Sequence, residues 1–112
     1  MGLNFTHIKG DTFNEVPFEL KINGSAVNLT GATIKMQLKK CATDTTPALS
    51  LTSVSSAGIT ITNAASGLFK INTQIINIEA WNYIYDMQFT FSSGEVKTYI
   101  NGQFTITQDV TV

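Results

Sequence analysis

Apolar and polar residues alternate along much of the chain, which is the pattern of β-strands with one face buried and one face in water. Residues 18–22 and 34–39 each carry three apolar side chains separated by charged or amide residues. The longest alternating run covers residues 83–91, whose apolar face holds Tyr83, Tyr85, Met87, Phe89 and Phe91. Helical spacing scarcely appears, so the pattern predicts a protein built almost entirely of strands.

Turn-forming residues separate these runs. Asn23-Gly24 is the dipeptide that best tolerates the positive φ angles of a tight hairpin turn, and residues 40–47 are predicted to form a loop. An interior glycine in a strand pattern commonly marks a bulge or a bend, which we expect at Gly102. Further strands are predicted at 48–52, 59–62, 69–73, 96–101 and 103–108.

Residues 74–80 fit neither strand alternation nor a long helix, and we expect one short helical turn there. Seven to nine short strands with turn signals every eight to twelve residues are typical of a sandwich. The sequence therefore predicts an all-β, immunoglobulin-like β-sandwich of mainly antiparallel strands, formed by one domain over residues 1–112. Its core should contain Phe18, Leu20, Ile34, Met36, Leu38, Phe69, Ile71, Tyr85, Met87, Phe89, Phe104 and Ile106.

The charge of the chain restricts its partners. The net charge is −1, and the seven basic residues are all lysines. Nucleic-acid-binding proteins present a basic patch and use arginine to contact bases and phosphates, so no nucleic-acid partner is expected. The longest apolar stretches are too short to cross a bilayer, so no membrane partner is expected either. Cys41 is the only cysteine, which excludes a disulfide within the chain.

Residues that could support catalysis are scarce. His7 is the only histidine, and no nucleophile or carboxylate stands at a spacing that would activate it. One histidine and one cysteine cannot complete a tetrahedral zinc site, and the eight carboxylates are scattered singly. We therefore expect no catalytic residues, no cofactor and no metal site, and a protein that acts by binding and not as an enzyme.

Three isoleucines and a tryptophan are crowded into the segment that breaks the strand pattern. Ile75, Ile76, Ile78 and Trp81 are candidates for an exposed apolar interface, because one short turn offers little room to bury all four. The alternative is that all four fold back and cap the open end of the core. Few charges guard the strand edges, so we also expect a homo-oligomer.

Four stretches together resemble a phage family. They are residues 8–13, 27–34, 82–87 and 102–111. In order and spacing they are similar to the N-terminal domain of phage baseplate upper proteins and related small tail- or fibre-associated proteins. In that family a GDT segment opens the domain, a DLTGxT segment precedes a strand, and a YxYD strand is followed by a closing GxxxVxxDVT segment. This chain carries Asn28 where the family usually has Asp.

The resemblance implies a structural protein of a phage or prophage virion, placed in the tail, baseplate or fibre, with other virion proteins as partners. It carries over no catalytic residue. A rival hypothesis is a carbohydrate-binding or adhesive surface module that uses Trp81, Tyr83 or Tyr99 as platforms for sugar rings. For Trp81 the alternative role is a residue that closes one end of the core.

Overall fold

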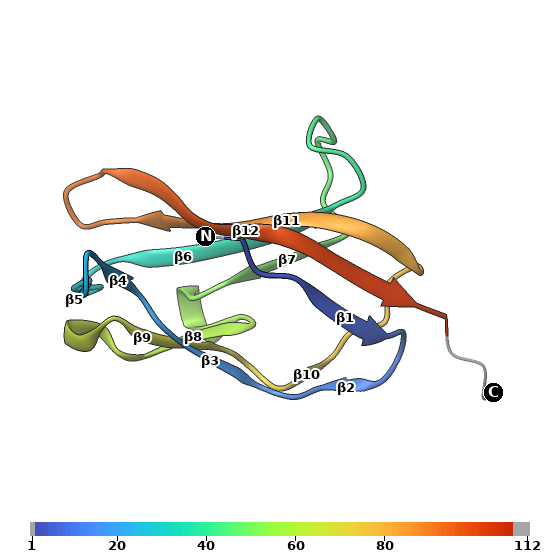
Figure 1. Cartoon of the computed structure of the whole chain (residues 1–112), viewed down its shortest axis with the longest axis horizontal. Coiled ribbons are helices and arrows are strands. Elements are labelled where there is room, and N and C mark those ends of the chain that lie inside the picture. Colours follow the sequence, from blue (N-terminus) through green and yellow to red (C-terminus); the bar gives the residue numbers. More distant parts are fainter. Residues whose placement is uncertain (1, 109–112) are drawn as a thin grey trace.

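Two β-sheets pack face to face in the computed structural model, which describes residues 2–108 (Figure 1). The larger sheet has five strands in the order β1-β12-β11-β6-β7. Their bounds are Phe5–Ile8 for β1, Val96–Thr107 for β12, Trp81–Thr90 for β11, Thr33–Lys39 for β6 and Leu49–Thr52 for β7. All neighbours in this sheet are antiparallel except β1, which runs parallel to the end of β12.

The smaller sheet faces the larger one across the core. Its three strands lie in the order β3-β9-β8, with bounds Val16–Glu19, Leu68–Ile71 and Ile59–Asn63. Two further antiparallel pairs extend this layer: β2 (Thr12–Phe13) with β10 (Gln74–Ile75), and β4 (Lys21–Ile22) with β5 (Ser25–Ala26). Within residues 2–108, eight strands have four residues or more. The predicted immunoglobulin-like sandwich of seven to nine short strands is therefore confirmed.

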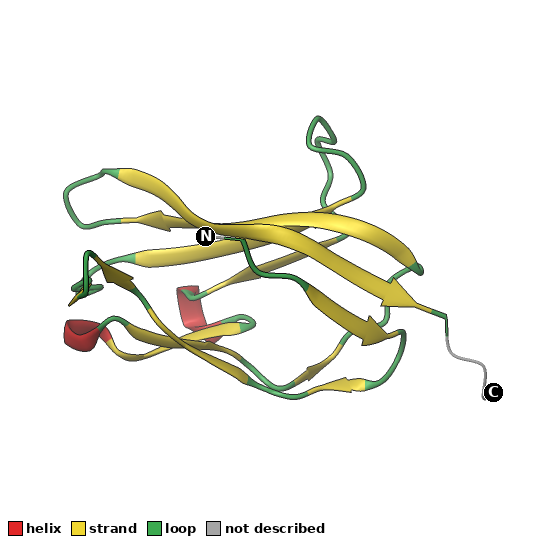
Figure 2. Ribbon diagram, viewed as in Figure 1, coloured by secondary structure: helices red, strands yellow, loops and turns green. Residues whose placement is uncertain are grey.

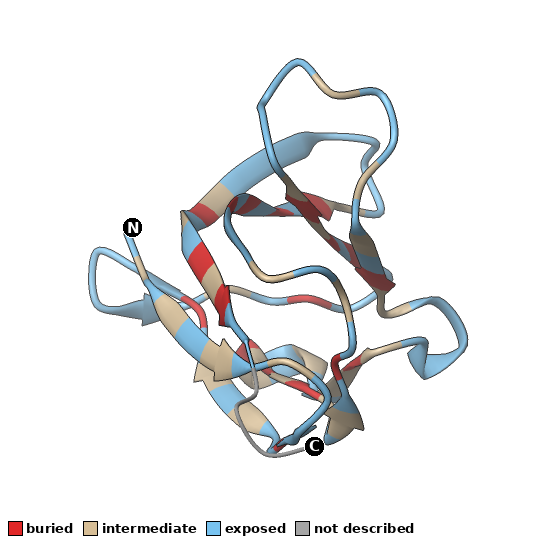
Figure 3. Cartoon of the chain, turned by 90° about the vertical axis from the view of Figure 1, so that its right-hand side faces the viewer, coloured by how far each residue is buried: buried red, intermediate tan, exposed pale blue. Residues whose placement is uncertain are grey.

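The core lies between the sheets and follows the predicted alternation. In Figure 3 buried and exposed positions alternate along the strands, and in β11 the burial alternates strictly from Asn82 to Phe89. Eleven of the twelve predicted core residues are buried. Phe18 is the exception: it is partly exposed, and its ring stacks on Phe69 with centroids 5.0 Å apart. Because β3 is an edge strand of the smaller sheet, Phe18 lies at the border of the core.

The expected hairpin at Asn23-Gly24 is present, because these two residues connect β4 and β5 with φ angles of 53° and 80°. The helical turn predicted within residues 74–80 is not formed. Backbone pairing takes its place: Ile75 in β10 pairs with Thr12, and the Ile76 carbonyl accepts a hydrogen bond from the Gly10 N–H at 2.8 Å. Helical residues occur instead in two short 3₁₀ turns, Val54–Ser56 and Ala64–Ser66 (Figure 2).

Gly102 does not divide two strands, as the sequence suggested, but lies inside the continuous strand β12. The register shift falls three residues earlier, because Met87 pairs with Ile100 and Gln88 pairs with Thr98. Tyr99 is therefore the extra residue of a bulge. Glycine is needed here for space, because a Cβ at position 102 would lie 2.2 Å from the carbonyl oxygen of Leu3.

Candidate functional site

Three neighbouring strands of the larger sheet direct side chains away from the core, and the register aligns these side chains in rows. β11 lies between β6 and β12, and its outward residues each have one partner on either side. We call the nine residues the grid, and its rows are Lys39–Ile84–Gln103, Gln37–Asp86–Asn101 and Lys35–Gln88–Thr98.

The grid lines a single open hollow of about 610 Å³ on the outer face of the sheet. Ala42 adds a wall from the 40–48 loop, which stands above the sheet in Figure 1. With neighbouring strands about 4.8 Å apart and a rise of about 3.4 Å per residue, the floor measures roughly 10 Å across the strands and roughly 13 Å along them. An extended ligand fits this floor better than a single ion does.

The polar side chains of the grid make no side-chain hydrogen bonds or ion pairs with other residues in the part of the chain that the structure describes. Each of its four amides offers two donors and one acceptor oxygen. Its two lysines and one aspartate leave a formal charge of +1 on the surface. The grid is therefore a dense array of available hydrogen-bonding groups with little net charge.

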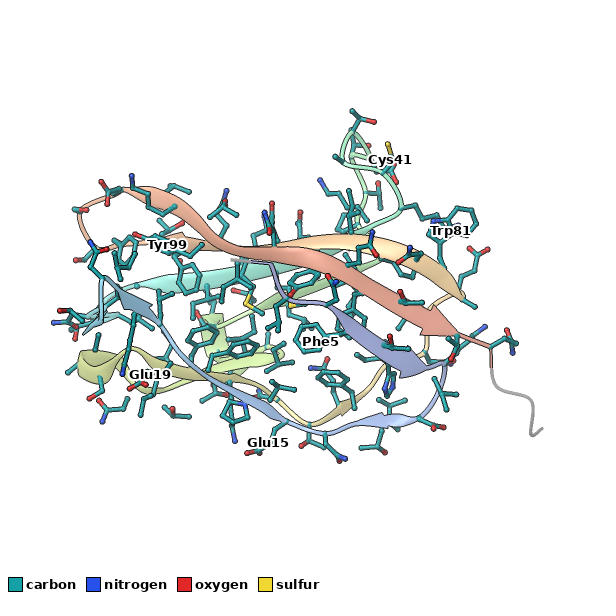
Figure 4. All side chains as sticks on the ribbon, viewed as in Figure 1. Phe5, Glu15, Glu19, Cys41, Trp81 and Tyr99 are labelled. Atoms are coloured by element: carbon teal, nitrogen blue, oxygen red, sulfur yellow. The ribbon has the colours of Figure 1, made fainter. Side chains whose placement is uncertain are left out.

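Lys40, the first residue of the 40–48 loop, forms a separate cluster with Glu79 and Trp81, and Figure 4 labels Trp81 near this loop. The Lys40 ammonium lies 2.6 Å from a Glu79 carboxylate oxygen and 4.5 Å from the centroid of the Trp81 ring. The hydrogen bond between them raises the pKa of Lys40 and lowers the pKa of Glu79. Trp81 does not line the hollow, and one face of its ring is already covered by a cation.

The four residues of the candidate apolar interface divide into two pairs. Ile76 is buried in the core, and Ile78 is partly buried against it. Ile75 and Trp81 are 69% and 48% exposed. Pairing of β10 with β2 explains why the neighbours Ile75 and Ile76 differ, because consecutive residues of an extended strand point to opposite faces. The four residues therefore form neither a fully exposed patch nor a complete cap of the core. Ile75 and Trp81 remain candidates for contacts with another protein chain.

His7 lies in β1, outside the hollow that the grid lines. Its Nε2 atom lies 2.9 Å from the Asp11 backbone carbonyl, and its ring meets the Phe13 ring edge-on with centroids 5.4 Å apart. Among residues 2–108 no group of three or more His, Cys, Asp or Glu side chains lies close enough together to hold a metal ion. In the same part of the chain no helix is long and apolar enough to cross a membrane.

The grid is not visible as a site in the sequence, although the strand pattern places several of its members correctly. The lysines of β6 and the polar residues of β11 were expected to face water, and they do. The missing information was which strands are neighbours, since β6 and β12 lie on either side of β11 only in the folded chain. The signal available in the sequence was the polar residues at outward positions of three separate strands, β6, β11 and β12.

Comparison with known proteins gives a fold but no family. No protein-family model matches the chain, and no curated protein matches it. Among solved structures, CopC from Methylosinus trichosporium OB3b is similar over 96% of this chain and 88% of its own, with a TM-score of 0.50 and 10% sequence identity. At that identity the likeness concerns the fold alone.

The predicted role as a phage or prophage virion structural protein is wrong. A solved structure similar in fold over nearly the whole chain is a CopC, and no family model or curated protein supports a tail, baseplate or fibre role. The four short motifs that suggested it consist of strand and turn residues; Gly31, for example, has φ 75° in a turn, and residues 109–111 lie outside the described chain. Such residues recur wherever sandwiches turn. The chain is thus an immunoglobulin-like β-sandwich similar in fold to CopC.

Proposed function

We propose that this domain binds carbohydrate, and that the binding surface is the hollow lined by the grid. The observation that supports this proposal is the three-by-three arrangement of outward side chains, eight of them polar, on one concave sheet face. Ligand sites combine concavity with a small set of convergent polar groups that fix orientation. The grid has both properties.

The chemistry of the grid matches hydroxyl groups. A sugar hydroxyl is both a donor and an acceptor, and so is a side-chain amide, which can meet it in either direction. The central row, Gln37–Asp86–Asn101, places a carboxylate between two amides. Adjacent rows lie two residues apart along the strands, which provides repeated contacts for an extended chain of sugars.

Charge argues against phosphorylated or strongly acidic ligands. The two lysines, Lys39 and Lys35, lie in the first and third rows, and Asp86 occupies the middle of the grid. An anion at the centre would approach a carboxylate, whose repulsion at close range opposes binding. Ile84, 36% exposed, supplies the apolar contact that the carbon face of a sugar ring needs. A neutral oligosaccharide satisfies both conditions, since it carries no negative charge and its sugar rings have apolar carbon faces.

The proposal is tested by screening the purified protein on immobilised neutral and acidic oligosaccharides and then titrating the best neutral ligand by calorimetry. Asp86→Ala and Gln88→Ala are expected to weaken binding by at least about tenfold each, which corresponds to about 1.4 kcal/mol. Glu95→Ala is the matched control: it removes an exposed carboxylate from the loop beyond β11 and should leave the dissociation constant unchanged. Trp81→Ala should also leave it unchanged, because Trp81 lies outside the hollow.

Binding of acidic sugars alone, or loss of binding in Trp81→Ala with the Asp86 variant unaffected, would contradict this site. Absence of binding to any neutral oligosaccharide on the array would contradict the function itself.

A further inference from the structure

The hollow lined by the grid is apolar at one end only. Ile84 belongs to the first row, and Ala42 follows Lys39 of the same row by three residues, so the 40–48 loop adds its wall beside this row. Tyr85 also lines the hollow, but its side chain is buried in the core. The second and third rows hold only polar side chains. The two ends of the hollow therefore suit different chemical groups.

Hydrogen-bonding groups lie directly beside the apolar end. Ile84 pairs with Gln103 on one side and with Lys39 on the other, and residues opposite each other on antiparallel strands have Cβ atoms about 4.5–5.5 Å apart. The Gln103 backbone is held in place, because its N–H donates to the Asn4 Oδ1 atom at 3.0 Å. The Gln103 side-chain amide offers donors and an acceptor, and the Lys39 ammonium offers donors only. A ligand methyl group placed on Ile84 therefore has an amide on one side of it and an ammonium on the other.

An N-acetyl group on a sugar ring combines these requirements. It holds a methyl group, a carbonyl oxygen and an N–H in one planar unit. A hydroxyl group at the same position forms the hydrogen bonds but leaves the apolar end of the hollow without a partner. Acetylation also keeps the sugar nitrogen uncharged, whereas a free amine would bring a second cation close to Lys39, and like charges at short range repel each other.

We infer that the first row binds an N-acetylated hexosamine unit of the oligosaccharide. The acetyl methyl group packs on Ile84 and Ala42, Gln103 accepts a hydrogen bond from the acetamido N–H, and Lys39 donates to the acetyl carbonyl oxygen. The second and third rows bind hydroxyl groups of the adjoining units. This assignment rests on the proposed function and names the class of sugar that the grid takes. Burial of one methyl group and one added hydrogen bond each improve binding severalfold, so the acetyl group decides which neutral oligosaccharide is preferred.

Chitotetraose and cellotetraose are the probes, because they share length and linkage, and chitotetraose carries an N-acetyl group where cellotetraose carries a hydroxyl. Calorimetry with the full chain should show chitotetraose bound at least about tenfold more tightly than cellotetraose. Fully deacetylated chitotetraose should bind more weakly than chitotetraose, since its amines are cations and the grid already carries two lysines.

Two variants place the preference at the first row. Ala42→Glu and Ile84→Ser should each bring the two dissociation constants close together, because a carboxylate or a hydroxyl replaces the apolar contact. Thr46→Glu is the matched control for Ala42→Glu: it adds the same charge to the same loop at an exposed residue that does not line the hollow, and it should keep the preference. The ratio of two dissociation constants within one variant does not change when only its stability falls, and circular dichroism shows whether each variant is folded.

Three results would overturn the assignment. Equal affinity of the unaltered chain for the two tetraoses, with both lost in Asp86→Ala, would exclude selection for the N-acetyl group and leave the proposed function in place. A preference for chitotetraose that survives in both Ala42→Glu and Ile84→Ser would exclude the first row as its source. Binding of other neutral oligosaccharides but of neither tetraose would exclude the N-acetylated unit alone, whereas absence of all binding would remove the proposed function as well.

Discussion

The carbonyl oxygen of Leu3 lies directly against Gly102, so close that a Cβ at position 102 would stand 2.2 Å from it. The φ angle of Gly102 lies outside the left-handed region. The requirement for glycine is therefore purely steric: the N-terminal segment runs close beside β12 at this point before it becomes β1.

Gly102→Ala should destabilise the domain by about 1–3 kcal/mol, because the new methyl group collides with backbone that cannot move freely. Chemical denaturation followed by tryptophan fluorescence measures the change. Gly2→Ala serves as the control, since nothing lies within 4 Å of a Cβ there; its unfolding free energy should stay within about 0.5 kcal/mol of the unaltered chain. Equal stability of the two variants would show that Leu3 is not held in place.

Tyr85→Phe tests the same junction through a hydrogen bond. The Tyr85 hydroxyl donates to the Leu3 carbonyl at 2.5 Å, and its removal leaves that carbonyl without this donor. The expected loss is about 1 kcal/mol of unfolding free energy at neutral pH. Gln88→Ala, on the outer face of the same strand, should change stability by less than about 0.5 kcal/mol.

Stability should also fall at high pH because of Tyr85. Burial raises the pKa of its hydroxyl to about 12, above the ordinary value of 10.0. Below pH 10 the hydroxyl is protonated in both states; between pH 10 and 12 the unfolded chain releases the proton first, so the free energy of unfolding decreases as pH rises. Denaturation midpoints across this window should decline less steeply in Tyr85→Phe. An identical decline in both proteins would exclude Tyr85 as a source.

Met87→Ala should cost about 2–5 kcal/mol through lost apolar burial and the cavity left behind. Met87 is fully buried in the middle of β11, where it pairs with Met36 and Ile100. Thermal unfolding measures the loss against the unaltered chain, and Phe104→Ala, which also removes a buried side chain, should show a loss of similar size. A cost below about 0.5 kcal/mol would mean that the two sheets do not pack closely at this position.

Ile75 and Ile76 are neighbours with opposite surroundings, and matched substitutions should separate them. Ile76→Ala removes a side chain that is 2% exposed and should cost about 2–5 kcal/mol, whereas Ile75→Ala removes one that is 69% exposed and should cost little. Chemical denaturation measures both. If Ile75 contacts another chain, Ile75→Ala should also lower the mass found by light scattering at high concentration, without loss of the fold.

The sequence by itself determined the strands, their inward faces and the all-β class. Alternation with a period of two is a local property, and burial of one face makes it visible in the order of residues from Tyr83 to Phe89. The hairpin at Asn23-Gly24 was predictable for the same reason, since the φ angles of a two-residue turn depend on those residues themselves.

Only the tertiary structure decided which strands became neighbours, and with that the grid and the opposite surroundings of Ile75 and Ile76. Gln37, Asp86 and Asn101 are far apart in the chain, and they form one row because β11 pairs with both β6 and β12. The close approach that requires Gly102 depends on where the N-terminal segment lies along β12. Such long-range pairings are set by how two sheets bury their apolar faces together, and no local pattern of residues records the outcome.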